Sequence, residues 1–160
     1  MIRYGPFVPV CLSLEWSSRI LIGMETRVRF LDGVRFEAEA RGHTTLCDQP
    51  VENGGQDSGM TPPEFLLASL GTCAGYYALQ YLKARGLSTV GLVVKVEAGK
   101  AAQPARMDHF RIVIDVPELV DARHREGVIR AAKNCLIHNT MLHAPSIELA
   151  LADVEALKSA

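Results

Sequence analysis

The sequence has few aromatic residues and almost no excess of either charge. Only 6% of its 160 residues are aromatic, and the formal net charge is −1 at pH 7. Proteins that bind nucleic acid usually carry a basic surface for the phosphates, and often aromatic side chains on which bases stack. We therefore expect no nucleic-acid partner. No apolar run reaches the roughly 20 residues that span a bilayer, so we also expect no membrane association.

Cysteine is scarce as well, with four residues at Cys11, Cys47, Cys73 and Cys135 and no C-x-x-C pair. Small secreted domains held by disulfides usually contain more cysteines at closer spacing. The sequence therefore predicts a cytoplasmic protein with free thiols, in which any disulfide is transient. The spacing of Cys135 and His138 is that of half a zinc site, but no second pair of ligands follows. We expect neither a metal nor another cofactor.

Residues 1–23 are predicted to be an N-terminal extension that does not belong to the folded domain or arises from a misplaced start. Residues 5–14 are mildly apolar, but Pro6 and Pro9 interrupt them, and only Arg3 supplies a positive charge. This pattern does not favour a signal peptide. Regular alternation begins directly after Met24, so we expect one domain, residues 24–160.

Within that domain, the hydrophobic pattern predicts an α+β fold. Val28 and Phe30 alternate with charged residues, and the Asp32-Gly33 pair is a hairpin signal. We expect strands at residues 25–31, 34–38, 43–47, 90–98, 110–116 and 147–151, helices at 62–85 and 118–134, and a short helical stretch ending at Leu142. The Gly-rich residues 48–61 are predicted to form a loop, without a phosphate-binding motif. This order favours antiparallel sheet packed on two helices.

The long helix at residues 62–85 has unusual composition. Thr61 can cap its first turn, Glu64 suits the positive end of the helix dipole, and Gly86 ends it. From residue 65 to 82 it is apolar or small on nearly every side. Such a helix must be buried all round, and so short a chain can hardly surround it. Five small residues would let another helix approach closely: Ala68, Gly71, Ala74, Gly75 and Ala78. The sequence therefore predicts a homodimer with this helix at its centre.

Cys73 lies in the middle of the long helix, and Cys135 lies where the short helix should begin. A buried cysteine commonly packs as a small hydrophobe, whereas a reactive one needs a nearby cation or hydrogen-bond donors to form its thiolate. The first N–H groups of the short helix would favour a thiolate at Cys135. Arg41 could orient a peroxide or hold a thiolate, although a charge at a strand end is usually solvated. Glu64 could orient that arginine in addition to its role at the helix start.

Three stretches together resemble the OsmC/Ohr family of organic hydroperoxide reductases: RGHTTLCDQP, GMTPPEFLLASLGTC and AAKNCLIHNTML. The resemblance covers residues 25–155 and implies an intertwined homodimer with central long helices. It further implies that Cys73 attacks the O–O bond of an organic hydroperoxide and becomes a sulfenic acid. Cys135 would then form a disulfide with Cys73, and a lipoyl-type or other small dithiol would reduce it. Family members activate the first cysteine with an arginine and a glutamate.

The activating residues depart from the family pattern. The family glutamate would fall at Pro63, beside Glu64, and the family arginine at Asn53 rather than at Arg41. Leu136 also replaces the proline that usually follows the second cysteine. Two further hypotheses therefore stay open. The protein could bind a small apolar ligand without catalysis, or it could be a redox sensor whose disulfide acts as a signal.

Overall fold

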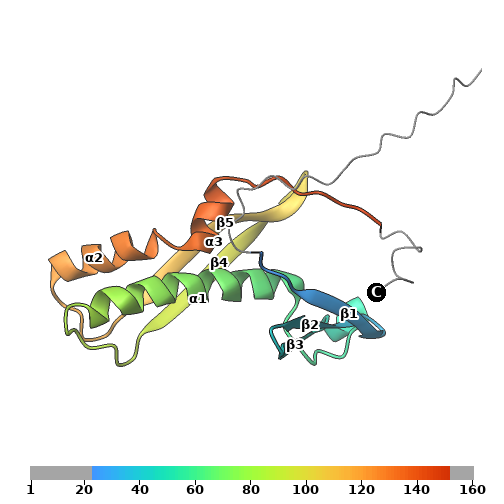
Figure 1. The fold of residues 1–160 in the computed structure, drawn as a ribbon, viewed down its shortest axis with the longest axis horizontal. Helices are drawn as coiled ribbons and strands as arrows, with labels where there is room; N and C mark the ends of the chain where they lie inside the picture. The colour runs from blue at the N-terminus through green and yellow to red at the C-terminus, as the bar shows by residue number, and fades with distance from the viewer. Residues whose placement is uncertain (1–22, 152–160) are drawn as a thin grey trace, which may run out of the picture.

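The computed structural model describes residues 23–151. Cys11 and the predicted extension, apart from Gly23, lie outside this range. Figure 1 shows a three-stranded sheet at one end of the molecule and, beside it, a long helix lying along a two-stranded hairpin that two shorter helices accompany. The strands in both sheets are antiparallel, so the predicted α+β class is confirmed. Within the described range, no helix is both long and apolar enough to cross a membrane.

The first sheet contains β1 (Arg27–Asp32), β2 (Arg35–Ala40) and β3 (His43–Cys47) in that order. The three predicted strands are confirmed within about three residues. The first turn lies one residue later than the Asp32-Gly33 signal suggests, since Asp32 already pairs with Arg35. In the second turn Arg41 and Gly42 both have positive φ, 54° and 79°. This is the conformation of a type I′ turn, which matches the twist of the flanking strands.

The long helix, α1 (Pro62–Lys83), begins and ends where its sequence signals indicate. The N–H and the hydroxyl of Thr61 donate to the Glu64 carboxylate at 2.7 and 2.8 Å. At the other end, the N–H of Leu87 donates to the carbonyl of Leu82 at 3.0 Å, and Gly86 has a φ of +63°. Glycine tolerates this left-handed conformation, which terminates the helix.

The remaining elements pack around α1. They are β4 (Val93–Ala102), β5 (Ala105–Asp115), α2 (Ala122–Ala132) and α3 (Leu136–Leu142). The strand predicted from residue 90 begins later because Val90 and Gly91 lie in a turn. The helix predicted from residue 118 begins at residue 122, because the Asp121 side chain accepts hydrogen bonds from the N–H groups of Arg123 and His124 and so caps it.

The prediction of a last strand at residues 147–151 is wrong. Ile147, Leu149 and Leu151 are 84%, 95% and 97% exposed, and none of them lies in a strand. Their alternation is suited to a strand, but a strand needs a neighbour to pair with its N–H and C=O groups. Within residues 23–151 no segment pairs with this one.

The core lies where α1, α2 and the ends of β4 and β5 meet, and it contains Ala78, Leu82, Leu119 and Val128. Two of the small residues expected to face another helix instead face β4. A Cβ on Gly71 or Gly75 would lie 3.0 Å from Val96 or 3.2 Å from Val94. These glycines therefore let α1 lie close on its own hairpin.

A single chain buries α1 on only part of its surface, as predicted for so short a chain. Leu66 and Tyr76 remain 39% and 58% exposed. The reason is that β4, α2 and α3 cover only part of the circumference of α1.

The Gly-rich loop between β3 and α1 is held by one buried carboxylate, Asp48. Its oxygens accept hydrogen bonds from the N–H groups of Gln49, Gln56 and Ser58 and from the Ser58 hydroxyl, at 2.7 to 3.1 Å. The Ser58 hydroxyl and N–H hold the pKa of Asp48 far below its usual range. The loop therefore has a defined structure that leads the chain into α1.

Candidate functional site

The fold brings Cys73 and Cys135 together, although 61 residues separate them in the sequence. Cys73 lies half-buried in the middle of α1, and Cys135 is fully buried at the residue before α3. The two side chains lie close enough that Cys73 raises the pKa of the Cys135 thiol. Both are free thiols. The spatial pairing on which a disulfide would depend is therefore present in the reduced protein.

The surroundings of the two thiols differ. Burial, followed by the neighbouring Cys73 side chain, raises the pKa of the Cys135 thiol above its usual value. The N–H of His138 donates to the Cys135 sulfur at 3.4 Å and opposes this shift only in part. Cys135 is therefore protonated at neutral pH and shielded from solvent, while Cys73 is the more accessible sulfur. The expected start of a short helix at Cys135 is confirmed, but its N–H groups do not outweigh burial.

Neither Arg41 nor Glu64 makes a polar contact with the cysteine pair among the described residues. Arg41 lies in the exposed turn between β2 and β3. The Glu64 carboxylate accepts two hydrogen bonds from Thr61. The bond from the Thr61 N–H and the bond from the Thr61 hydroxyl both lower the pKa of Glu64. Among the described residues, neither side chain makes a hydrogen bond or ion pair with Cys73. Glu64 thus stabilises the start of the helix that carries Cys73.

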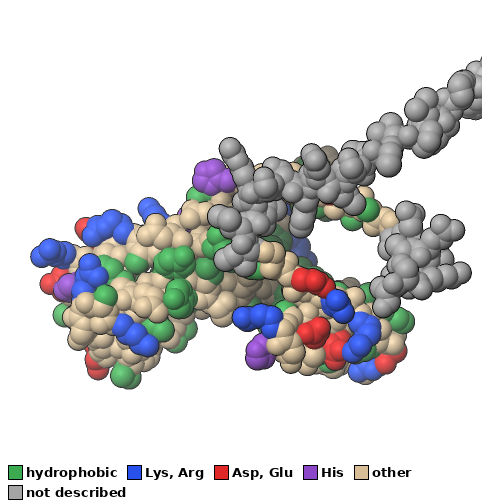
Figure 2. Space-filling view, viewed as in Figure 1, with side chains coloured by type: hydrophobic (Ala, Val, Ile, Leu, Met, Phe, Trp, Pro, Cys, Tyr) green, Lys and Arg blue, Asp and Glu red, His purple; other side chains and the backbone are tan. Residues whose placement is uncertain are grey.

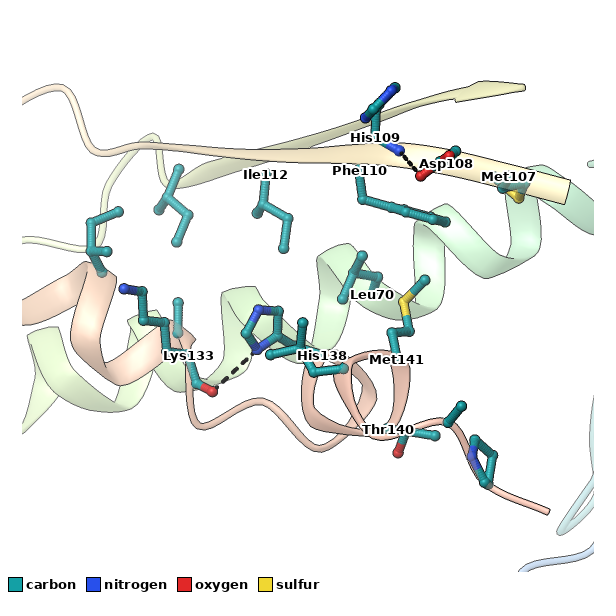
Figure 3. A pocket seen from close by; sticks show the side chains of 16 residues that line it. Leu70, Met107, Asp108, His109, Phe110, Ile112, Lys133, His138, Thr140 and Met141 are labelled. Carbon is teal, nitrogen blue, oxygen red and sulfur yellow. Dashed lines mark hydrogen bonds between the residues drawn. The ribbon is translucent and has the colours of Figure 1, made fainter. Parts of the chain in front are cut away.

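A pocket of about 800 Å³ lies between β5 and α3, and neither Cys73 nor Cys135 is among its lining residues. Figure 3 shows Phe110 and Ile112 pointing from β5 toward α3, with Leu70 of α1 and Met141 of α3 opposite them. Leu70 lies one helical turn before Cys73, and His138 lies one turn after Cys135. Most of the lining is apolar, with a few polar groups, as is typical of small-molecule sites.

Two polar residues of this pocket, Lys133 and His138, lie just after the end of α2. The ring Nδ1 of His138 lies 3.3 Å from the carbonyl oxygen of Lys133, so in the neutral ring Nδ1 carries the proton and Nε2 is free to accept one. The Lys133 side chain also borders the pocket (Figure 3). These are the cationic or titratable groups nearest to Cys135 in the chain, and they come from the AAKNCLIHNT stretch.

Sequence reasoning missed the contribution of β5 to this pocket. The register of the hairpin shifts between Glu97 and Gly99, and His109 has a φ of 53° at that bulge. The bulge leaves Phe110 and Ile112 on the pocket side and His109 on the other (Figure 3). Alternation in the sequence indicates which residues of β5 are apolar, but it does not indicate that α3 lies opposite them.

The family model described as OsmC-like protein matches residues 55–150, more than half of the chain. No curated protein sequence matches. In the structure, residues 23–151 contain no cluster of three or more His, Cys, Asp or Glu side chains that could hold a metal ion.

Solved structures share the fold at low sequence identity. A Psychrobacter arcticus protein, named for osmotic stress induction and detoxification response, has a TM-score of 0.67 and 21% identity, over 76% of this chain and 90% of its own. An OsmC-like protein from Mycoplasma pneumoniae gives 0.65 and 16%, over 78% and 91%. The organic hydroperoxide resistance protein OhrB of Bacillus subtilis gives 0.54 and 15%, over 76% and 91%. At these identities the likeness shows the fold alone.

Proposed function

The chain belongs to the OsmC-like family, and from this premise we propose that it is a thiol peroxidase that reduces organic hydroperoxides in oxidative stress defence. The observation that carries the proposal is the proximity of the Cys135 and Cys73 side chains. A peroxidase that resolves its own sulfenic acid needs its second thiol within bonding reach of the first. The name of the related OhrB, an organic hydroperoxide resistance protein, favours the same chemistry.

The proposed reaction begins at Cys73. Its thiolate attacks the outer peroxide oxygen, the O–O bond breaks, and the alkoxide leaves as an alcohol after taking a proton. Cys73 becomes a sulfenic acid, oxidised by two electrons. The Cys135 sulfur then attacks the Cys73 sulfur, hydroxide leaves as water, and a disulfide forms. A dithiol reductant, of lipoyl type or another small thiol, restores both cysteines by exchange and becomes a disulfide itself.

The pocket supports an organic rather than an inorganic peroxide. Its walls of Leu70, Phe110, Ile112 and Met141 offer an apolar organic group a dry surface, and burying apolar area contributes about 25 cal/mol per Å². Arg41 and Glu64 stay predicted activating residues. The exposed turn of Arg41 and the helix-capping contacts of Glu64 favour structural roles for both.

We further propose that the protein is a homodimer. An apolar groove of about 610 Å³ follows α1 along β4, and the exposed Tyr76 and the half-buried Leu79 border it. The face of the first sheet that carries Val28 and Phe30 is exposed too, at 63% and 58%. Exposed apolar surface of this extent is typical of an association site. The α1 helix of a second copy would cover this surface and form the predicted central pair of helices.

The test is peroxide consumption. The full-length protein should consume cumene hydroperoxide in the presence of dihydrolipoamide, and Cys73→Ser should not. Cys135→Ser should consume one equivalent of peroxide per subunit and then stop, with a sulfenic acid at Cys73 that dimedone traps. Cys47→Ser is the matched control, because Cys47 lies on β3 and takes no part in the cysteine pair. It should keep the wild-type rate.

Two outcomes would contradict the proposal. Turnover that survives in Cys73→Ser would show that another group is the nucleophile. Absence of peroxide consumption by the wild type with every dithiol tested would leave the ligand-binding alternative, which the apolar pocket favours. A disulfide that forms once with peroxide and is not reduced by any dithiol at a catalytic rate would instead favour the redox sensor.

A further inference from the structure

A second hollow, of about 460 Å³, lies between α1 and α2 and shares no residue with the pocket between β5 and α3. We call it the arginine groove. Its polar lining is Tyr81, Arg85, Arg123, His124, Arg130 and Asn134. In the space-filling view, Lys and Arg side chains gather at the end of the molecule where α1 ends and α2 begins (Figure 2). No carboxylate lines this groove, so its surface is positive.

The base of the arginine groove is built from fixed contacts. The Tyr81 hydroxyl lies 3.2 Å from Nδ1 of His124, and the guanidinium carbon of Arg85 lies 3.8 Å from the centre of the Tyr81 ring. The Tyr81 ring lies directly over Gly127, where a Cβ would come within 1.9 Å of the hydroxyl oxygen. The stacking orients Arg85 at the edge of the groove, and the glycine makes this arrangement sterically allowed.

The charges of the groove are poorly compensated within the protein. Arg130 reaches Glu126 at 3.4 Å, but both side chains are largely exposed, and such a pair is weak. Neither Arg85 nor Arg123 forms an ion pair with any other described residue. A guanidinium group presents several N–H donors in one plane and therefore binds the oxygens of phosphate or carboxylate in pairs. Two uncompensated guanidinium groups beside a phenol and an imidazole suit a small oxyanion.

We propose that the arginine groove binds a small oxyanion, the phosphate or carboxylate group of a low-molecular-weight ligand. Arg85, in the turn after α1, and Arg123, on α2, hold the charge, and the Tyr81 hydroxyl or His124 supplies a neutral hydrogen bond. The site joins the end of the helix that carries Cys73 to α2. This inference does not depend on the peroxidase proposal, because the two sites share no residue.

Binding is tested by calorimetry on the full chain at low ionic strength, with inorganic phosphate in one arm and acetate in the other. Arg85→Gln and Arg123→Gln should each weaken the binding of the preferred anion about tenfold or more, since a hydrogen bond to a charged group contributes about 1.5–3 kcal/mol. Arg125→Gln is the matched control, because it removes the same charge from the same helix but from the face that borders a different hollow. It should leave the affinity within twofold.

Each result has a defined meaning. Saturable binding of phosphate but not acetate identifies a phosphate site, and the reverse identifies a carboxylate site. An equal loss in Arg125→Gln would show a diffuse charge effect and overturn the proposal, as would the absence of saturable binding in both arms. If Arg85→Gln does not fold by circular dichroism, Arg123→Gln decides the outcome, because its side chain leaves the exposed start of α2 and packs on no core residue.

Discussion

Replacing Gly127 by alanine tests the contact between α1 and α2, because local and tertiary effects predict opposite signs. Gly127 lies inside α2, where alanine is the better helix former by about 1 kcal/mol. From helix propensity alone, Gly127→Ala should stabilise the protein. In the folded protein, however, the new Cβ would lie 1.9 Å from the hydroxyl oxygen of Tyr81 and 2.1 Å from its ring carbon Cζ. The ring must therefore move.

The cost of moving Tyr81 can be assembled from its contacts. The hydrogen bond with His124 contributes about 1 kcal/mol, and the stacking of Arg85 about 0.5–1 kcal/mol. Tyr81 also packs against the core residues of α1 and α2, and overpacking such a contact costs about 1–3 kcal/mol. These losses exceed the gain in helix propensity. We expect the free energy of unfolding to fall by about 2 kcal/mol.

Urea denaturation at one protein concentration measures this change. The reasoning requires a double-variant comparison, in which Gly127→Ala is made in wild type and in Tyr81→Ala. Without the tyrosine ring, the same substitution should raise the free energy of unfolding by about 1 kcal/mol, its helix-propensity value. A stabilising effect of Gly127→Ala in the wild-type background would refute the packing argument. An equal effect in both backgrounds would show that Tyr81 is not the obstacle.

Three further predictions concern single side chains. Arg41→Asn should raise the free energy of unfolding by up to about 1 kcal/mol, because asparagine tolerates positive φ in a type I′ turn; if peroxide turnover also falls at least tenfold, Arg41 is an activating residue and not only a turn residue. Asp48 has a lowered pKa, so its stabilisation is fully present above its unfolded pKa of about 4 and is lost gradually as pH falls below that value toward the much lower folded pKa. Asp48→Asn should therefore be less stable than wild type at pH 7. The gap between the two urea midpoints should begin to narrow below about pH 4 and keep narrowing as pH falls, whereas a constant gap would contradict the assignment. Leu70→Ala should destabilise the protein by about 2–4 kcal/mol, because the side chain is 1% exposed; peroxide assays at several substrate chain lengths should show a larger loss for longer apolar groups, and a uniform loss would separate Leu70 from the substrate pocket.

The elements that carry their own signals could be predicted from the sequence. Thr61, Glu64 and Gly86 locate the ends of α1 because the capping contacts join residues a few positions apart. The alternation in β1 and β2 predicts a hairpin for the same reason, and the stretches around Cys73 and Cys135 resemble the family that the comparison confirms. The strand predicted at residues 147–151 fails because an alternating pattern does not supply a pairing partner.

The sequence by itself determined the α+β class and the start and end of the central helix, and it singled out Cys73 and Cys135 as the candidate redox pair. Each of these follows from side-chain chemistry that acts over a few residues or from a motif that can be read in order. Only the tertiary structure decided that Cys135 is fully buried with a raised pKa, and that Gly71 and Gly75 face β4. It also decided that Arg85 and Arg123 meet across one groove. These features depend on packing between segments far apart in the chain, so no local pattern encodes them.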